Sequence, residues 1–144
     1  MKNLLMFVMM CFMITFANAQ SGQAIGIRGI YDVGGSVTYK INVHNQSAFE
    51  VIGTFYKYRD FDITALYEIH RNIGDRGKFS YYYGIGGHTN LRVSNLAAVG
   101  VLGLDYRFSK IPLNLSLDWI PTILTLKRDD YRFNGGGLAI RYMF

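Results

Sequence analysis

The stretch GGGLAIRYMF (residues 135–144) ends the chain and alternates between two kinds of side chain. Successive side chains of a β-strand point to opposite faces, so this alternation predicts a strand with one apolar face. Chain termini usually fray, so an alternating apolar strand that ends on an aromatic residue at the last position calls for an explanation. The apolar face consists of Leu138, Ile140, Tyr142 and Phe144.

The same alternation recurs along the chain from residue 23 onward, in segments separated by breaks with turn-forming composition. After residue 20 no segment has helical periodicity, and no apolar run is long enough for a membrane-spanning helix. The 16 glycines, 11 tyrosines and 10 phenylalanines, against 2 prolines, favour strands. We therefore expect strands at residues 23–31, 36–43, 48–58, 61–71, 78–88, 96–108 and 113–120, and a last one at the C-terminus.

The two faces of these predicted strands differ in character. One collects large apolar and aromatic residues, and the other mixes small polar residues with charges. Because eight strands enclose a space that side chains can fill, small residues and paired charges suit the interior. We therefore expect an all-β fold, an eight-stranded antiparallel up-and-down transmembrane barrel with aromatic residues toward the strand ends. The expected ion-pair network of the lumen is Arg28, Lys40, Glu50, Glu68, Asp105, Arg107, Asp118 and Arg141.

The opposite assignment of the two faces describes a different protein. A soluble periplasmic barrel of lipocalin type would have an apolar core and a charged exterior. It would place Trp119 and the row from Leu113 to Leu117 around a ligand inside the barrel. This interpretation is the main alternative to a membrane barrel.

The N-terminus has the three parts of a secretory signal peptide. Lys2 provides the positive charge, residues 4–16 form an apolar run, and Ala17-Asn18-Ala19 is a cleavage site of small residues. We expect residues 1–19 to be removed during Sec export, which leaves residues 20–144 as one barrel domain. The sole cysteine, Cys11, would leave with the signal peptide, so the mature chain would have no disulfide.

The terminal LAIRYMF, with Phe144 last, resembles the C-terminal recognition strand of bacterial outer-membrane β-barrels. The stretches YYYGIGGH (81–88) and IPLNLSLDWIP (111–121) are similar to those of small uncharacterised outer-membrane barrels of Bacteroidota. The chain from about residue 23 onward resembles the eight-stranded OmpA-barrel and OmpX class. The resemblance implies residence in the outer membrane of a Gram-negative cell envelope. It also implies recognition by the barrel assembly machinery, with Leu138, Ile140, Tyr142 and Phe144 as the assembly signal.

An even number of strands puts both termini on the periplasmic side and the odd-numbered connections outside. The expected external loops then lie around residues 88–95 and 121–135. In the second loop, Lys127, Arg128 and Arg132 are candidates for contacts with lipopolysaccharide phosphates. We expect a structural or surface-interaction role through these loops, for a monomer whose partners are outer-membrane lipid and lipopolysaccharide. The scattered charges do not indicate nucleic-acid binding.

Candidate catalytic residues are few. None of His44, His70 and His88 is followed two residues later by a serine, which a lipid A deacylase could use as its nucleophile. The histidine spacing and the missing thiolates argue against a metal site. We expect no enzymatic activity, no cofactor and no metal, and a lipid A-modifying enzyme that uses His88 is the less favoured alternative. The filled interior of an eight-stranded barrel also argues against a solute pore.

Overall fold

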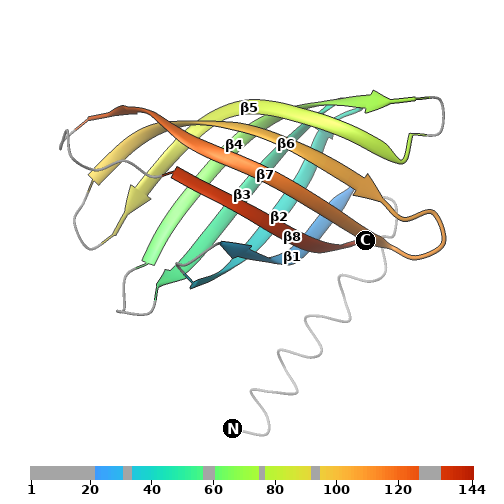
Figure 1. Ribbon diagram of the computed structural model, residues 1–144, viewed down its shortest axis with the longest axis horizontal. Coiled ribbons are helices and arrows are strands. Elements are labelled where there is room, and N and C mark those ends of the chain that lie inside the picture. Colours follow the sequence, from blue (N-terminus) through green and yellow to red (C-terminus); the bar gives the residue numbers. More distant parts are fainter. Residues whose placement is uncertain (1–21, 31–33, 57–60, 75–76, 92–94, 127–133) are drawn as a thin grey trace, which may run out of the picture.

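The computed structural model describes residues 22–30, 34–56, 61–74, 77–91, 95–126 and 134–144. These residues form a closed antiparallel barrel, in which each strand pairs with the next and β1 also pairs with β8 (Figure 1). The predicted eight-stranded fold is therefore confirmed. Within the same residues, no helix is both long and apolar enough to cross a membrane. The strands are β1 (Gln23–Ile30), β2 (Gly34–His44), β3 (Ser47–Tyr56), β4 (Phe61–Ile73), β5 (Phe79–Asn90), β6 (Asn95–Arg107), β7 (Leu113–Thr125) and β8 (Asn134–Met143).

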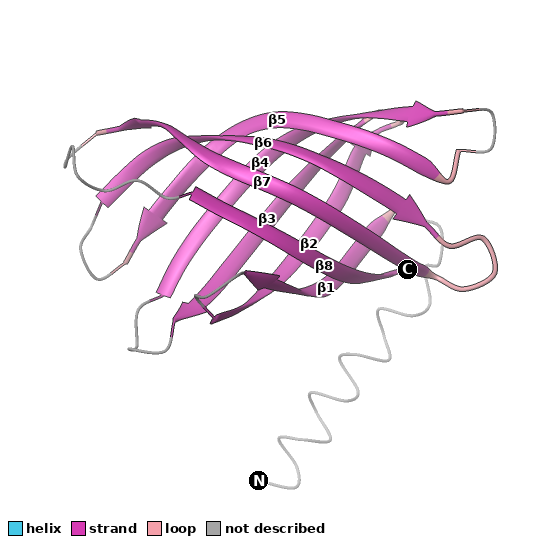
Figure 2. Cartoon of the chain, viewed as in Figure 1, coloured by secondary structure: helices cyan, strands magenta, loops and turns pink. Residues whose placement is uncertain are grey.

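The first and last strands close the barrel. Strands β1 and β8 stay in register from the pair Ala24 and Met143 to the pair Ile30 and Gly137. Beyond β8, the amide of Phe144 donates to the carbonyl of Gln23 at 3.0 Å, and the amide of Gln23 donates to the carbonyl of Phe144 at 3.3 Å. The last residue is thus held by β1. We call the end of the barrel that contains Gly22 and Phe144 the terminal end (Figure 2).

The apolar face of the strands lies outside and the charged face inside. Ile27 and Trp119 are 68% and 50% exposed, whereas Arg28 and Glu50 are 1% exposed. This distribution is the inverse of the one in a soluble barrel. The lipocalin-like alternative required Trp119 and the leucines of β7 inside, and it is wrong on this point because Trp119 and Leu117 face outward.

Strand β7 is longer than the sequence indicated. We expected a connection from residue 121, but β7 continues through Pro121 to Thr125. The register between β6 and β7 shifts between Ala98 and Val99, close to this proline. Proline fits where the pairing is already irregular, because its missing N–H breaks fewer regular hydrogen bonds there. The loop that we expected to begin at residue 121 therefore begins after Thr125.

Strand β8 begins at Asn134, inside the loop that was expected at residues 121–135. Its glycines pair with β7, with Gly136 opposite Trp119 and Gly137 opposite Asp118. Strand β5 likewise continues to Asn90. The connections expected at residues 88–95 and 121–135 therefore shorten to 91–94 and 126–133. Glycine has low strand propensity, so the sequence pattern underestimated the length of β8 at its glycine-rich start.

Candidate functional site in the barrel interior

Arg141 of β8 is the centre of the polar network inside the barrel. Its guanidinium forms an ion pair with Glu50 of β3, and its Nε lies 3.2 Å from a carboxylate oxygen of Glu50. It also donates to Ser116 Oγ at 2.5 Å and to Asn114 Oδ1 at 3.3 Å, both on β7. Thr38 of β2 donates to the same carboxylate. Side chains of β2, β3 and β7 thus hold the buried cation of β8 through charge-assisted hydrogen bonds.

Lys40 of β2 extends the network across the lumen. Its Nζ lies 3.3 Å from a carboxylate oxygen of Glu50 and 2.7 Å from one of Glu68, so one ammonium bridges two carboxylates. The same ammonium lies 4.6 Å from the ring centroid of Tyr82, a cation–π distance. Glu68 also contacts His70 Nε2 at 2.9 Å. The His70 ring stacks on Tyr82 with centroids 4.8 Å apart.

A second ion pair joins β1 and β7. Arg28 donates to Asp118, and the hydroxyl of Tyr82 donates to the other oxygen of Asp118 at 2.9 Å. Two inward glycines make room for these large side chains. A Cβ on Gly137 would lie 2.6 Å from the Arg28 guanidinium carbon, and one on Gly103 would lie 2.4 Å from the Tyr82 ring. The small residues of the inner face therefore set the space for the charged and aromatic ones.

Most of the predicted lumen residues meet in this network. Arg28, Lys40, Glu50, Glu68, Asp105, Asp118 and Arg141 are buried, with exposed fractions of 6% or less. Arg107 is the exception: its side chain is 46% exposed at the terminal end, where its Nε lies 3.7 Å from Asp105. Asp105 instead accepts a 2.7 Å hydrogen bond from Asn114 Nδ2. Arg107 therefore lies at the edge of the predicted network, because it is the last residue of β6 and its side chain is largely exposed.

Sequence reasoning did not single out the neutral members of the network. Thr38, Asn114 and Ser116 bond directly to the charged groups. Each of these residues lies an even number of positions from a predicted lumen charge on the same strand. That shared parity is the signal that could have identified them, since alternate residues of a strand share a face.

An apolar layer lies next to the charged network. Its members are 5% exposed or less and come from β3, β4, β5, β6 and β7. Tyr82 belongs to both groups, with its ring in this layer and its hydroxyl on Asp118. Because close-packed apolar side chains exclude water, this layer can close the lumen. The layer consists of Ile52, Leu66, Tyr82, Val99, Val101 and Ile120.

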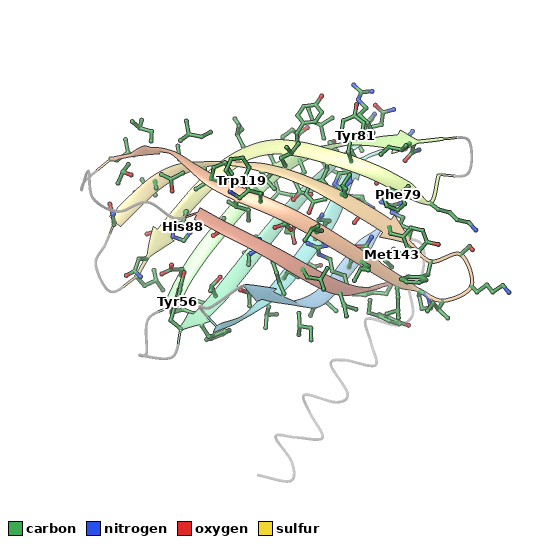
Figure 3. The ribbon with its side chains drawn as sticks, viewed as in Figure 1. Tyr56, Phe79, Tyr81, His88, Trp119 and Met143 are labelled. Atoms are coloured by element: carbon green, nitrogen blue, oxygen red, sulfur yellow. The ribbon has the colours of Figure 1, made fainter. Side chains whose placement is uncertain are left out.

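A second polar group lies toward the opposite end, where His88 is labelled in Figure 3. Thr64 Oγ1 lies 2.8 Å from His88 Nδ1, and His88 Nε2 lies 3.3 Å from a carboxylate oxygen of Asp62. Asn90 donates to the other oxygen of Asp62 at 2.5 Å. This order of hydroxyl, imidazole and carboxylate is that of a hydrolytic triad, but all four residues are 5% exposed or less. A nucleophile needs contact with its substrate, so this burial favours a structural hydrogen-bond network.

A cavity of about 530 Å³ opens at the terminal end. Lys40, His70, Asp105 and Asn114 line its buried part, and Met143 and Phe144 line it beside the last strand. In the described ranges, no group of three or more histidine, cysteine, aspartate or glutamate side chains could hold a metal ion. The cavity therefore offers polar side chains from the network without a metal-ligand cluster.

The remaining predicted residues lie elsewhere. Leu138, Ile140 and Tyr142 face outward from β8 and are 50%, 48% and 37% exposed. The Tyr142 and Phe144 rings stack with centroids 6.5 Å apart. The expected signal peptide, residues 1–19, and the candidate lipopolysaccharide contacts Lys127, Arg128 and Arg132 lie outside the described residues.

Comparisons with known proteins identify the fold. No protein-family model and no curated protein matches the chain. A solved structure described as a de novo design of transmembrane β-barrels matches with a TM-score of 0.59 and 12% sequence identity, over 85% of this chain and 96% of that one. The designed barrel TMB2.3, solved by solution NMR, matches with a TM-score of 0.62 and 8% identity, over 86% and 94%. At such low identity the likeness concerns the fold alone, an eight-stranded closed antiparallel barrel similar to designed transmembrane barrels.

Proposed function

We propose that this chain is an integral outer-membrane β-barrel protein with a structural or surface-interaction role and no enzymatic activity. The observation that carries the proposal is the inverted distribution of side chains. Large apolar residues such as Ile27, Ile85 and Trp119 are 50–68% exposed around the barrel, while the carboxylates of the described strands are buried. In water such an exterior would be an unusually large apolar patch, whereas in lipid it is the expected surface.

The dimensions and the closure of the barrel support the same proposal. The strands are 8–13 residues long. A tilted strand needs about 9–11 residues to cross the hydrocarbon core. A closed barrel also leaves no unpaired strand edge, which lipid would not tolerate. The similarity to designed transmembrane barrels agrees with a membrane location.

The interior favours a sealed barrel over a transporter. The ion pairs of Arg28, Lys40 and Arg141 fill one part of the lumen, and the apolar layer fills the next. Eight-stranded barrels have room for side chains inside, and aqueous channels use 16 or more strands. We therefore assign the function to the two ends of the barrel and to its lipid-facing wall.

Export, assembly and partners complete the proposal. Residues 1–19 would direct Sec export, and Leu138, Ile140, Tyr142 and Phe144 would be read by the barrel assembly machinery. The monomer would contact outer-membrane lipid, and Lys127, Arg128 and Arg132 would contact lipopolysaccharide phosphates. The last assignment rests on charge alone. Replacing these three residues with glutamine should lower the amount of lipopolysaccharide that co-purifies, and unchanged co-purification would remove the assignment.

The deciding experiment is cell fractionation followed by a heat-modifiability gel. The full-length chain is expressed, the outer membrane is isolated, and boiled and unboiled samples are compared. A band in the outer-membrane fraction that migrates faster before boiling supports a closed membrane barrel. A soluble periplasmic band without a shift contradicts it. A lipid A-modifying activity would instead appear as an altered lipid A mass on overexpression that His88→Ala abolishes.

A further inference from the structure

The charges of the described residues are sorted by sign between the interior and the surface. The carboxylate side chains in these ranges, Glu50, Asp62, Glu68, Asp105 and Asp118, are all buried, with exposed fractions of 6% or less. Glu50, Glu68 and Asp118 form ion pairs inside with Arg28, Lys40 and Arg141, whereas Asp62 contacts His88 and Asp105 contacts Arg107. The acidic side chains of the described residues therefore lie in the lumen, and the charged side chains on the surface of these residues are basic.

The other four basic residues of the described ranges gather at the terminal end. Arg71 lies near the end of β4, Lys78 directly precedes β5, Arg107 ends β6, and Lys110 lies in the turn before β7. The start of β5 and the end of β6 are adjacent, because the amide of Arg107 donates to the carbonyl of Lys78 at 2.8 Å. Arg71, Arg107 and Lys110 are exposed, and Lys78 is half-buried. We call these four residues the basic rim.

Little compensates the charge of the basic rim. Arg71 donates to the neutral side chain of Gln46 at 2.6 Å, which leaves its charge in place. Arg107 forms an ion pair of 3.7 Å with Asp105, so one of the four positive charges is compensated. In the sequence, Asp75 and Arg76 between β4 and β5 carry opposite charges and add none. Three of the four positive charges of the basic rim therefore stay in excess at this end of the described residues.

Aromatic side chains lie next to the basic rim. Phe79 and Tyr106 pack with ring centroids 5.6 Å apart, and Tyr106 and Phe108 form an edge-on pair at 4.9 Å. Tyr81 lies opposite Arg71 in the register of β4 and β5. Figure 3 shows Phe79 and Tyr81 on the strands near the terminal end. Such aromatic residues mark the level of the lipid headgroups in transmembrane barrels.

We propose that the basic rim binds the phosphates of anionic phospholipid headgroups in the leaflet that faces the terminal end. This inference rests on the proposed membrane function and adds a partner and an orientation to it. A headgroup fits better than a free anion, because the basic residues border the aromatic residues that define the lipid–water boundary. Anionic headgroups attract basic residues near the membrane surface, and guanidinium groups bind phosphate through paired hydrogen bonds. The barrel would thus be anchored at a defined depth with its terminal end toward the anionic leaflet.

The test measures which lipids stay bound to the barrel. The full mature barrel is reconstituted in nanodiscs of equal amounts of phosphatidylglycerol and phosphatidylcholine. The barrel is then released from the nanodisc in the mass spectrometer, and native mass spectrometry counts the lipids of each kind that stay bound to it. We expect the wild type to retain more phosphatidylglycerol than phosphatidylcholine. The variant Arg71→Gln, Lys78→Gln, Arg107→Gln and Lys110→Gln should reduce that preference by at least about fivefold, the effect of a single basic residue near a charged surface.

The control removes three positive charges from the β3–β4 and β5–β6 connections, which carry no assigned binding role. It carries Lys57→Gln, Arg59→Gln and Arg92→Gln, is compared with Arg71→Gln, Lys78→Gln and Lys110→Gln, and should keep the preference of the wild type. The pair Lys78→Gln and Lys110→Gln alone should give an intermediate loss. Equal retention of both lipids by the wild type, an equal loss in the control, or an unchanged preference in the rim variant would each overturn the inference.

Two further arms separate the alternatives. Inorganic phosphate and sodium chloride are added at equal ionic strength, and both should weaken retention equally by screening. A stronger effect of phosphate would mean a site for a free anion and would overturn the headgroup assignment. Each variant is also checked for the heat shift on a gel. A wild type without that shift refutes the proposed function itself, whereas a wild type that shifts and retains both lipids equally refutes only the basic rim.

Discussion

Arg28 and Asp118 are 90 residues apart in the chain and form a buried ion pair inside the barrel. They sit on β1 and β7, and β8 lies between these strands. The pair therefore spans the curved wall of the barrel and exists only when the barrel is closed. Tyr82, from β5, completes it by donating to the same carboxylate.

Removing one member of this pair should be costly. Asp118→Ala leaves the Arg28 guanidinium buried without its counter-ion, so we expect a loss of about 3–5 kcal/mol in the free energy of unfolding. The measurement is urea unfolding in lipid vesicles, followed by the fluorescence of Trp119. The double variant Arg28→Met with Asp118→Leu removes both charges and should recover most of the loss. If the double variant is as unstable as Asp118→Ala, the cost does not come from the unpaired charge.

Gly103 is the position where an added methyl group meets the network. The new Cβ of Gly103→Ala would lie 2.4 Å from the Tyr82 ring, so Tyr82 must shift away from Asp118 and His70. We expect a destabilisation of about 1–3 kcal/mol in the same unfolding assay. Gly87→Ala is the matched control on the neighbouring strand, because nothing lies within 4 Å of its Cβ. An equal effect at both positions would indicate a general cost of alanine in these strands.

The apolar layer should be the barrier to ions. In planar bilayers we expect no steady conductance from the wild type, because Ile52 and Leu66 are 1% exposed within this apolar layer. Ile52→Ala with Leu66→Ala opens space in that layer and should raise the conductance measurably above the wild-type baseline. The outward pair Ile85→Ala with Leu104→Ala is the control and should leave the baseline unchanged. A conducting wild type would contradict the sealed lumen.

The last residue should have two separable roles. Its backbone bonds to Gln23, and its side chain belongs to the expected assembly signal. Phe144→Ala keeps the backbone bonds, so we expect normal refolding into detergent micelles but a lower yield in the outer membrane. Deleting Phe144 removes the bonds as well and should lower both yields. If Phe144→Ala assembles in cells like the wild type, the aromatic side chain is not read during assembly.

The fold was accessible from the sequence because strand alternation is a local property. The residues Arg28, Glu50, Asp118 and Arg141 could be assigned to one face without knowledge of the fold, since neighbouring side chains of a strand point to opposite sides. The strand ends were less accessible. Pro121 and the glycines from Gly135 to Gly137 have low strand propensity, and only pairing with the adjacent strand keeps them in β7 and β8.

Which charge pairs with which could not be predicted in this way. Lys40 bridges Glu50 and Glu68 on the next two strands, whereas Arg28 of β1 forms an ion pair with Asp118 of β7, on the far side of β8. These choices depend on the register of each strand pair and on the curvature of the closed wall. Arg107 shows the same limit: it shares the strand face of Asp105, but it is the last residue of β6 and its side chain is 46% exposed.

The sequence by itself determined the strand class, the two faces and the closed eight-stranded barrel, because period-two alternation and turn composition act over a few residues. Only the tertiary structure decided the ion-pair partners, the apolar layer, the shorter connections and the basic rim at the terminal end. The physical reason is that these features join residues of different strands, and their distances are set by register and closure rather than by any one segment.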